Sequence, residues 1–225
     1  MAVNAPVCRA IIAITVGIYV LELFLGDPFV NRFVSFGPAI AAGEYYRLLT
    51  SVFLHLQFDG RLFTLLHLGF NMYILSIYGA QVEQIFGSVR FLFLYLTTGF
   101  VASSVSYAFN DCVAGLGASG AVFGIVGLLI VYLYNRRSSR FTDQYLRSMG
   151  MFVAINLLFG AVVPGIDNLA HVGGLVAGLA LGIGLDRGRL TRPGSAVPLQ
   201  IATWIAVLGA GVILVVMRTS NFSCF

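Results

Sequence analysis

Long apolar segments separated by short polar stretches set the strongest limit on how this chain can fold. Apolar residues make up 59% of its 225 residues, and charged residues only 10%. A run of about 18 or more apolar residues without charge is long enough to cross a lipid bilayer as a helix. We therefore predict an all-α polytopic membrane protein that forms one compact unit. Its seven predicted spans cover roughly 10–25, 63–81, 91–109, 119–134, 148–163, 168–185 and 198–217.

The connection between the first two predicted spans, residues 26–62, is too rich in aromatic and aliphatic side chains for a free linker. We expect short helices there that lie in the membrane interface, with Tyr and Arg at the level of the lipid headgroups. The first apolar segment is not followed by a convincing small-residue cleavage site. We therefore interpret it as a retained span and not as a signal peptide.

The charge of +4 comes from arginine alone, because the sequence contains no lysine. In a chain of membrane spans this excess indicates loop topology and not nucleic-acid binding, since cytoplasmic loops are enriched in basic residues. If the N-terminus is cytoplasmic, that side carries Arg9, Arg90, Arg136, Arg137, Arg140, Arg147, Arg187, Arg189 and Arg192. The other side carries only Arg32, Arg47, Arg61 and Arg218. We predict a cytoplasmic N-terminus and a C-terminus outside.

Three polar side chains in different predicted spans share one depth in the membrane. At about 1.5 Å per helical residue, Ser119 lies about 24 Å from the cytoplasmic end of its span. The corresponding lengths are about 22 Å for His171 and about 24 Å for His67. The hydrocarbon core is about 30 Å thick, so the three groups lie somewhat below the outer surface. Their common depth predicts a single site.

The residue types at this depth favour acyl transfer. A serine needs a base to take its proton, and histidine is the usual one. Because no Asp lies within the spans at this depth, Ser119 and His171 are predicted to form a dyad and not a Ser-His-Asp triad. His67 and Asn71 are four residues apart and share one helix face. Both can point at the same oxygen, and the backbone N–H of Ser119 is a third candidate donor to an oxyanion.

A glycine stripe explains how the serine and the histidine could meet. Gly174, Gly178 and Gly182 lie on nearly the same face of the sixth predicted span as His171. The fourth span supplies Gly120, Gly124 and Gly127. Small residues at this spacing allow membrane helices to approach closely. We expect these two spans to pack together and to bring Ser119 against His171.

Each of these residues also has a simpler interpretation. The glycines around Ser119 can be a packing motif alone, and Asn71 can form a hydrogen bond between helices. His67 and His171 could join His55 as metal ligands, but no carboxylate or cysteine accompanies them at that depth. Three cysteines show no metal-ligand spacing, and we interpret them as small buried or interfacial hydrophobic residues: Cys8, Cys112 and Cys224.

Taken together, three motifs resemble the rhomboid intramembrane serine proteases. They are His67-x-x-x-Asn71, Gly117-Ala118-Ser119-Gly120 and Ala170-His171-x-x-Gly174-x-x-x-Gly178. The resemblance implies a rhomboid-like six-helix transmembrane bundle over residues 10–186. A short cytoplasmic N-terminus, 1–9, precedes this catalytic core. Residues 187–225 supply a linker, one extra C-terminal transmembrane helix and a short tail.

The resemblance also implies an activity. It is cleavage of membrane-anchored protein substrates near the outer end of their transmembrane helix, with no cofactor, metal or ATP. Ser119 and His171 would be catalytic, and His67, Asn71 and the Ser119 amide would bind the oxyanion. Supporting positions would be Gly117, Phe123, Asn168, Gly174 and Gly178. We expect the protein to reside in a bacterial plasma membrane, whereas its oligomeric state stays open.

The chain departs from the family pattern in a few places. Phe123 stands where the family often has a tyrosine that stacks on the catalytic histidine, and Tyr46-Arg47 resembles a Trp-Arg signature. The segment 56–66 is also longer than usual before His67, whereas Glu83 agrees with the family in resembling the glutamate of its second span.

Two other functions compete with proteolysis. A non-catalytic rhomboid-like protein that binds membrane helices would typically lack the serine or the histidine, and both are present here. A transporter or channel would show repeat symmetry and intramembrane ion ligands, and the sequence shows neither.

Overall fold

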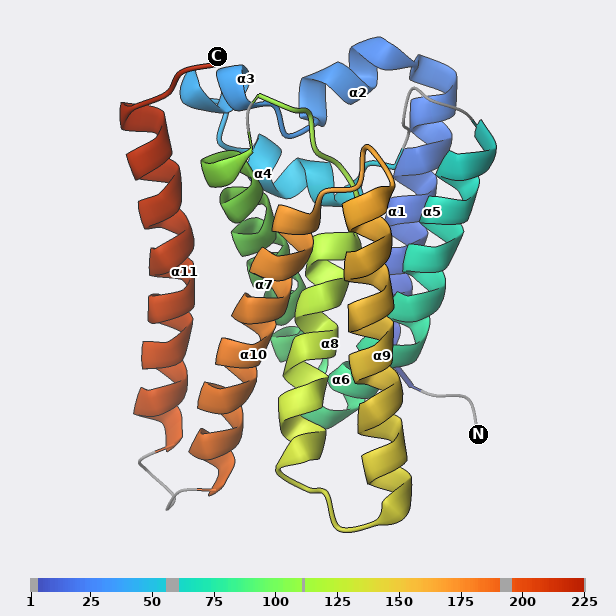
Figure 1. Cartoon of the computed structure of the whole chain (residues 1–225), viewed down its shortest axis with the longest axis vertical. Coiled ribbons are helices and arrows are strands. Elements are labelled where there is room, and N and C mark those ends of the chain that lie inside the picture. The colour runs from blue at the N-terminus through green and yellow to red at the C-terminus, as the bar shows by residue number, and fades with distance from the viewer. Residues whose placement is uncertain (1–3, 56–60, 111, 191–195, 225) are drawn as a thin grey trace.

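The computed structural model describes residues 4–55, 61–110, 112–190 and 196–224, and the side chains of 61–63, 187–190 and 196 are not described. Helices traverse one bundle, and the two termini lie at its opposite ends (Figure 1). Within the described residues, five helices are long and apolar enough to cross a membrane. They are α1 (Pro6–Leu25), α7 (Ser88–Phe109), α9 (Arg140–Val162), α10 (Asn168–Leu190) and α11 (Ala196–Ser220). A shorter apolar helix, α8 (Ser119–Tyr134), lies among them. The protein is a multi-pass integral membrane protein.

The second predicted span is interrupted by a wider turn. It consists of α5 (Arg61–Ile74), a π-helical turn η2 (Leu75–Gly79) and α6 (Ala80–Phe86). The thiol of Cys8 donates a hydrogen bond of 3.3 Å to the carbonyl oxygen of Leu75. Gly79 lets α1 and α7 pack closely here, because a Cβ on it would lie 3.1 Å from Cys8 Sγ and 3.2 Å from Phe91. A single straight helix was expected, so this is a correction.

Short helices cover the upper end of the bundle, as expected for the long first connection (Figure 1). They are α2 (Asp27–Phe33), α3 (Gly37–Ala41), α4 (Arg47–Thr50) and the 3-10 turn η1 (Ser51–Phe53). Arg47 holds them together. Its buried guanidinium donates to the carbonyl oxygens of Asn31, at 2.7 Å, and Val34, at 3.0 Å, and pairs with Glu44 at 2.7 Å.

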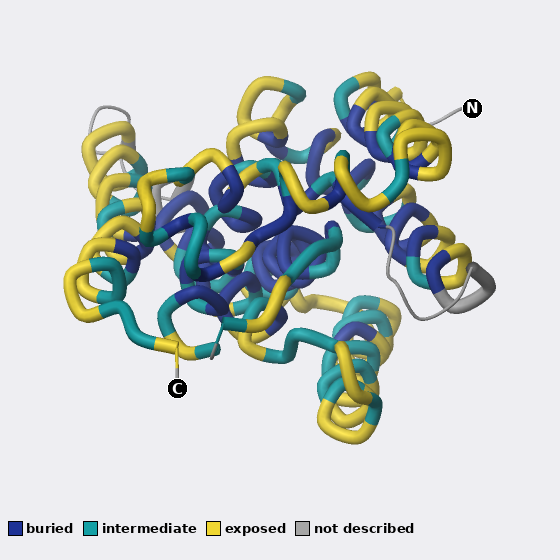
Figure 2. Tube along the Cα trace, turned by 90° about the horizontal axis from the view of Figure 1, so that it is seen from above, coloured by how far each residue is buried: buried dark blue, intermediate teal, exposed yellow. Residues whose placement is uncertain are grey.

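The core of the bundle is built around α8. All its residues from Gly120 to Leu129 are buried, and its most extensive contact is with α10. By contrast, only 6% of the most apolar stretch of α9 is buried inside the protein, whereas 61% of the corresponding stretch of α7 is buried. Exposed residues therefore lie on the outer faces of the peripheral helices (Figure 2). In lipid these faces meet acyl chains, so their exposure is the expected arrangement.

The predicted packing of the fourth and sixth spans is confirmed. A Cβ on Gly174 would overlap the carbonyl oxygen of Gly120, and a Cβ on Gly178 would overlap that of Gly124. Only glycine fits at such a backbone-to-backbone contact. This stripe sets α10 directly against α8, with Ser119 and His171 just above it.

Two helices begin earlier than hydropathy indicated. The fifth span was expected from residue 148, but α9 begins at Arg140, where the hydroxyl of Ser139 caps it by accepting from Thr142 N at 3.2 Å. The first span was expected from residue 10, but α1 begins at Pro6. The buried carboxylate of Glu83 accepts from the amides of Val7, at 3.0 Å, and Cys8, at 2.7 Å. Such caps satisfy the free amides of a helix start.

The expectation for the cysteines was wrong in part. Cys8 is buried and free, as expected. Cys112 and Cys224 form a disulfide with a Cα–Cα distance of 5.8 Å. Because the two cysteines are 112 residues apart in the chain, the sequence gives no sign that they pair. The fold brings the loop after α7 and the tail after α11 to the same upper end of the bundle (Figure 1).

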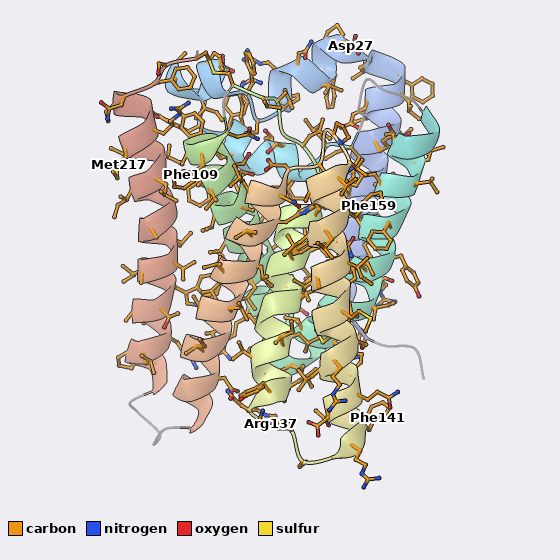
Figure 3. All side chains as sticks on the ribbon, viewed as in Figure 1. Asp27, Phe109, Arg137, Phe141, Phe159 and Met217 are labelled. Atoms are coloured by element: carbon orange, nitrogen blue, oxygen red, sulfur yellow. A yellow bond between two sulfur atoms is a disulfide. The ribbon has the colours of Figure 1, made fainter. Side chains whose placement is uncertain are left out.

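The arrangement of the loops follows the predicted alternation. The N-terminal end and the loop between α8 and α9 lie at the lower end, where Figure 3 shows Arg137. The loops before α8 and α10 lie at the upper end. Part of the arginine count falls outside what the structure describes, namely the side chains of Arg61, Arg187 and Arg189 and residues 191–195. Residues 56–60 of the longer segment 56–66, and residues 1–3 of the predicted N-terminal segment, also lie outside the described residues.

Candidate active site

The predicted contact between serine and histidine is present. Ser119 is the first residue of α8, and His171 lies in the first turn of α10. The Oγ atom of Ser119 is 2.8 Å from Nε2 of His171, a hydrogen-bond distance suited to proton transfer. Ser119 is half-buried, whereas His171 is only 7% exposed. The hydroxyl can therefore be reached while its partner is held inside the bundle.

Phe123 fixes the plane of the imidazole. It lies one turn after Ser119 on α8, and its ring stacks on that of His171 with centroids 4.4 Å apart and planes 4° apart. The stacking expected for this position is thus made by a ring that has no hydroxyl. A flat contact of this kind restricts rotation of the imidazole and leaves Nε2 directed at the serine.

The carboxylate nearest to the pair is bound elsewhere. Asp167 accepts a short hydrogen bond from the hydroxyl of Ser106 and another, of 3.0 Å, from the amide of Ala170. Nδ1 of His171 has no hydrogen-bond partner among the described residues. Asp167 lies in the loop just before α10 and outside the predicted spans, in which no Asp was expected. The geometry is nevertheless that of a dyad, because the carboxylate holds the loop before α10 and not the imidazole.

Hydrogen-bond donors surround the serine. The first amides of an α-helix lack intrahelical partners, and Ser119 N–H is one of them at the start of α8. His67 lies against Gly117, where a Cβ would come within 3.0 Å of its ring. Gly117 has φ +123°, a conformation that L side chains rarely adopt. Asn71 lines the same cavity and donates to the carbonyl oxygen of His67 at 3.0 Å. The second N–H of this amide group is a further donor.

His55 belongs to the site in a way that the sequence did not reveal. Its Nε2 accepts a hydrogen bond of 3.3 Å from the amide of Ala118, next to the serine. Burial lowers the pKa of His55 to about 3, so the ring is neutral and Nε2 is free to accept. The sequence suggests His55 only as a possible metal ligand, since nothing in its sequence surroundings indicates proximity to Ala118. It orients the peptide from which α8 starts.

A cavity of about 1100 Å³ opens beside the pair. The loop 113–117 and residues 165–167 are among the residues that line it. Its sides come from α5 and α9, with Leu66 and Phe70 on α5 and Ile155 and Phe159 on α9. These four side chains are also exposed, and Figure 3 shows Phe159 on the upper half of α9. The cavity is therefore bordered on this side by exposed apolar side chains.

Two predicted polar positions lie away from the pair. Asn168 donates to the carbonyl oxygen of Leu157 at 3.0 Å and joins α10 to α9. Glu83 caps α1 and accepts from the hydroxyl of Ser88 at 2.6 Å. Both side chains hold helices in place and do not reach Ser119 or His171.

Comparison with known proteins agrees with this geometry. The sequence profile of the rhomboid domain matches residues 42–187. The chain belongs to the rhomboid family. The matched rhomboid region includes His67, Asn71, Ser119 and His171, whereas α1 and α11 lie outside it.

Named rhomboid relatives come from bacteria, plants and fungi. The chain is 38% identical over 180 residues to the "Rhomboid protease GluP" of Bacillus subtilis, which covers 75% of this chain and 33% of the relative. It is 36% identical over 144 residues to the mitochondrial "RHOMBOID-like protein 6" of Arabidopsis thaliana, with 64% and 44% covered. It is 33% identical over 149 residues to "Rhomboid-type serine protease 2" of Emericella nidulans, with 64% and 27% covered. The chain thus spans less than half the length of each of these relatives.

Proposed function

We propose that the protein is an intramembrane serine endopeptidase in which Ser119 is the nucleophile and His171 the general base. The contact of 2.8 Å between Ser119 Oγ and His171 Nε2 beside an open cavity carries the proposal. Membership of a family whose relatives are named proteases supports it. A serine is a weak nucleophile unless a neighbouring base removes its proton, and His171 is positioned to do so.

Two half-reactions complete the hydrolysis. The Ser119 hydroxyl proton moves to Nε2 of His171 while Oγ bonds to the substrate carbonyl carbon. The imidazolium then gives this proton to the leaving amine as the C–N bond breaks, and an acyl ester remains on Ser119. His171 next takes a proton from water, and the resulting hydroxide attacks the ester. The new carboxyl end leaves, and the proton returns to Ser119 Oγ.

The oxyanion of each tetrahedral intermediate would be bound by the Ser119 amide, the side-chain amide of Asn71 and the ring of His67. Donors held in place before the reaction stabilise charge only as it develops, so they act on the transition state. The close contact between His67 and Gly117 supports this arrangement, because Gly117 is only two residues before Ser119.

The substrate would enter from the lipid between α5 and α9. Their upper halves border the cavity with apolar side chains that also face outward, and α9 buries little of its surface against the rest of the bundle. A membrane-anchored protein can reach the serine by this route without leaving the bilayer. Cleavage would then occur near the outer end of its transmembrane helix, and the reaction would need no cofactor and no nucleic acid.

The site would face the outside of a cell membrane. The loops before α8 and α10 lie opposite the end where Arg136, Arg137 and Arg140 gather, and basic residues favour the cytoplasmic side. We propose a cytoplasmic N-terminus, an external C-terminus and residence in a bacterial plasma membrane.

Labelling with a fluorophosphonate tests the nucleophile directly. The purified protein should be labelled in detergent and should cleave a model membrane-anchored substrate, and Ser119→Ala should abolish both. Ser119→Ala should retain the thermal unfolding midpoint of the wild type, because the hydroxyl is half-exposed. A wild-type protein that binds the substrate helix without labelling or cleavage would instead be a non-catalytic helix-binding relative.

A further inference from the structure

The disulfide between Cys112 and Cys224 joins two parts of the chain that no motif connects. Cys112 lies in the loop between α7 and α8, seven residues before Ser119, and Cys224 lies in the tail after α11. The region matched by the rhomboid profile, 42–187, contains Cys112 but neither Cys224 nor α11. The bond therefore attaches a helix outside the family core to the loop that leads into the proposed nucleophile.

The tail after α11 is well packed where it meets the bundle. Phe222 stacks on Tyr107 with ring centroids 6.1 Å apart, and a Cβ on Gly37 would lie 3.1 Å from the Phe222 ring. The hydroxyl groups of Tyr107 and Thr219 are 3.0 Å apart, and Arg218 donates to the carbonyl oxygen of Ser223 at 3.2 Å. The tail that carries Cys224 is therefore packed against α7 and α3.

The second half of the loop is held by backbone hydrogen bonds. Gly115 exchanges two of them with Ser35, of 3.1 and 2.8 Å, and Gly117 N donates to the carbonyl oxygen of Ser51 at 3.0 Å. These contacts and the bond from Ala118 to His55 carry the chain into the start of α8. The residues from Val113 to Gly117 line the cavity throughout.

The first half of the loop depends on the disulfide. Val113 is exposed, and Cys112 has a φ of +51°, a conformation that non-glycine residues adopt only when the surroundings hold them in it. The bond to Cys224 joins this half of the rim covalently to the packed tail of α11.

We propose that this disulfide makes α11 a positioning element of the protease site and that activity depends on the oxidation state of the pair. The inference rests on the proposed function of Ser119. With the bond formed, the tail holds the rim loop and, through it, the start of α8. With the bond reduced, two electrons and two protons from a dithiol convert it to two thiols, and the dithiol becomes a disulfide. The rim at 112–114 is then released, while the contacts at 115 and 117 remain.

The pair also bears on which side the site faces. The loop between α7 and α8 and the tail after α11, which this disulfide joins, lie at the upper end of the bundle, and residues 113–117 of that loop line the cavity. Disulfides persist in oxidising compartments and are rare in reducing ones. The pair thus assigns the upper end to the outside independently of the arginine distribution.

The test compares the oxidised protein with Cys112→Ser, Cys224→Ser and the double variant. Cys8→Ser is the matched control, since it removes the buried free thiol far from the rim. Cleavage of a model membrane-anchored substrate is measured with and without dithiothreitol, well below the unfolding midpoint of the reduced form. A misplacement of about 1 Å at a catalytic group can cost about 10²-fold in rate. Because part of the loop stays held, we expect reduction to lower kcat about 10-fold, with KM nearly unchanged.

Several results identify positioning in particular. Reoxidation should restore the wild-type rate, the three rim or tail variants should match the reduced protein, and none of them should respond to dithiothreitol. Cys8→Ser should behave as the wild type. The rate of fluorophosphonate labelling should fall in parallel with kcat, which a loss of stability alone would not produce below the unfolding midpoint.

Other results would overturn the inference. An unchanged kcat after complete reduction would do so, as would a Cys112 thiol that is freely alkylated in protein isolated without reductant. If the oxidised protein neither cleaves the substrate nor reacts with the fluorophosphonate, the proposed function is refuted independently of the role of the disulfide. Hydrogen exchange at the amides of 113–117 then tests whether the disulfide holds this loop. Faster exchange after reduction supports a loop held by α11, and equal exchange refutes it.

Discussion

Replacing Gly178 by alanine should disable the site from a distance. Gly178 lies seven residues after His171, about 10 Å along the helix axis, and lines no part of the cavity. A Cβ at this position would overlap the carbonyl oxygen of Gly124. That oxygen belongs to the backbone of α8 and cannot rotate away as a side chain could. The two helices must therefore separate.

The size of the effect follows from the geometry. Real Cβ atoms essentially never come within 3.0 Å of another heavy atom, and a separation of about 1 Å would take the Ser119–His171 contact beyond hydrogen-bond reach of about 2.6–3.2 Å. Misplacement on this scale costs about 10²-fold in rate. The overpacking itself should cost about 1–3 kcal/mol of stability.

The assay measures kcat for a membrane-anchored substrate together with thermal unfolding in detergent. Gly150→Ala is the matched control, because nothing lies within 4 Å of a Cβ there. That variant should keep wild-type activity and gain up to about 1 kcal/mol, since glycine is unfavourable within a helix. Wild-type kcat in Gly178→Ala, or an equal loss in Gly150→Ala, would refute the link between the glycine stripe and the dyad.

Three further substitutions separate chemistry from support. Asn71→Ala should lower kcat by at most about 10²–10³-fold with little change in KM, because it removes one oxyanion donor of three; complete loss of turnover would assign it a larger role. Phe123→Tyr should leave kcat near wild type, since the ring that stacks on His171 is kept, and a large decrease would contradict this. Asp186→Ala should lower the free energy of unfolding by about 1–3 kcal/mol, and with it the unfolding midpoint, because buried Asp186 pairs with Arg136 at 2.6 Å. Activity well below the midpoint should be unchanged.

Helix starts that coincide with a loop signal could be predicted from the sequence, and those set by tertiary contacts could not. The starts at Ser119 and Asn168 were predicted at the residues where α8 and α10 begin. The early start of α9 escaped hydropathy because its first turns are polar and are fixed by a cap. The π-helical turn in the second span, Leu75–Gly79, has no counterpart in the sequence pattern, since its residues continue the apolar composition of the span.

The same distinction applies to the site. Depth along the spans was enough to group Ser119 with His171, because polar groups inside a membrane are few and helices convert residue number into height. Contacts made by irregular backbone were missed. His55 reaches the amide of Ala118 from the first connection, and Cys224 reaches the loop before α8 from the far end of the chain. Neither contact follows from a helical period or from a fixed spacing between residues, so neither can be predicted from the sequence.

Close helix packing and proton transfer depend on the same few residues here. Between helices in lipid there is little hydrophobic driving force, so van der Waals contact must hold α8 against α10. Glycine at 174 and 178 permits that contact and leaves no flexible side chain in the interface. The first turn above this contact carries the serine on one helix and the histidine on the other. The length of their hydrogen bond is therefore set by backbone packing, and any change that widens the interface should lower the proposed activity before it unfolds the protein.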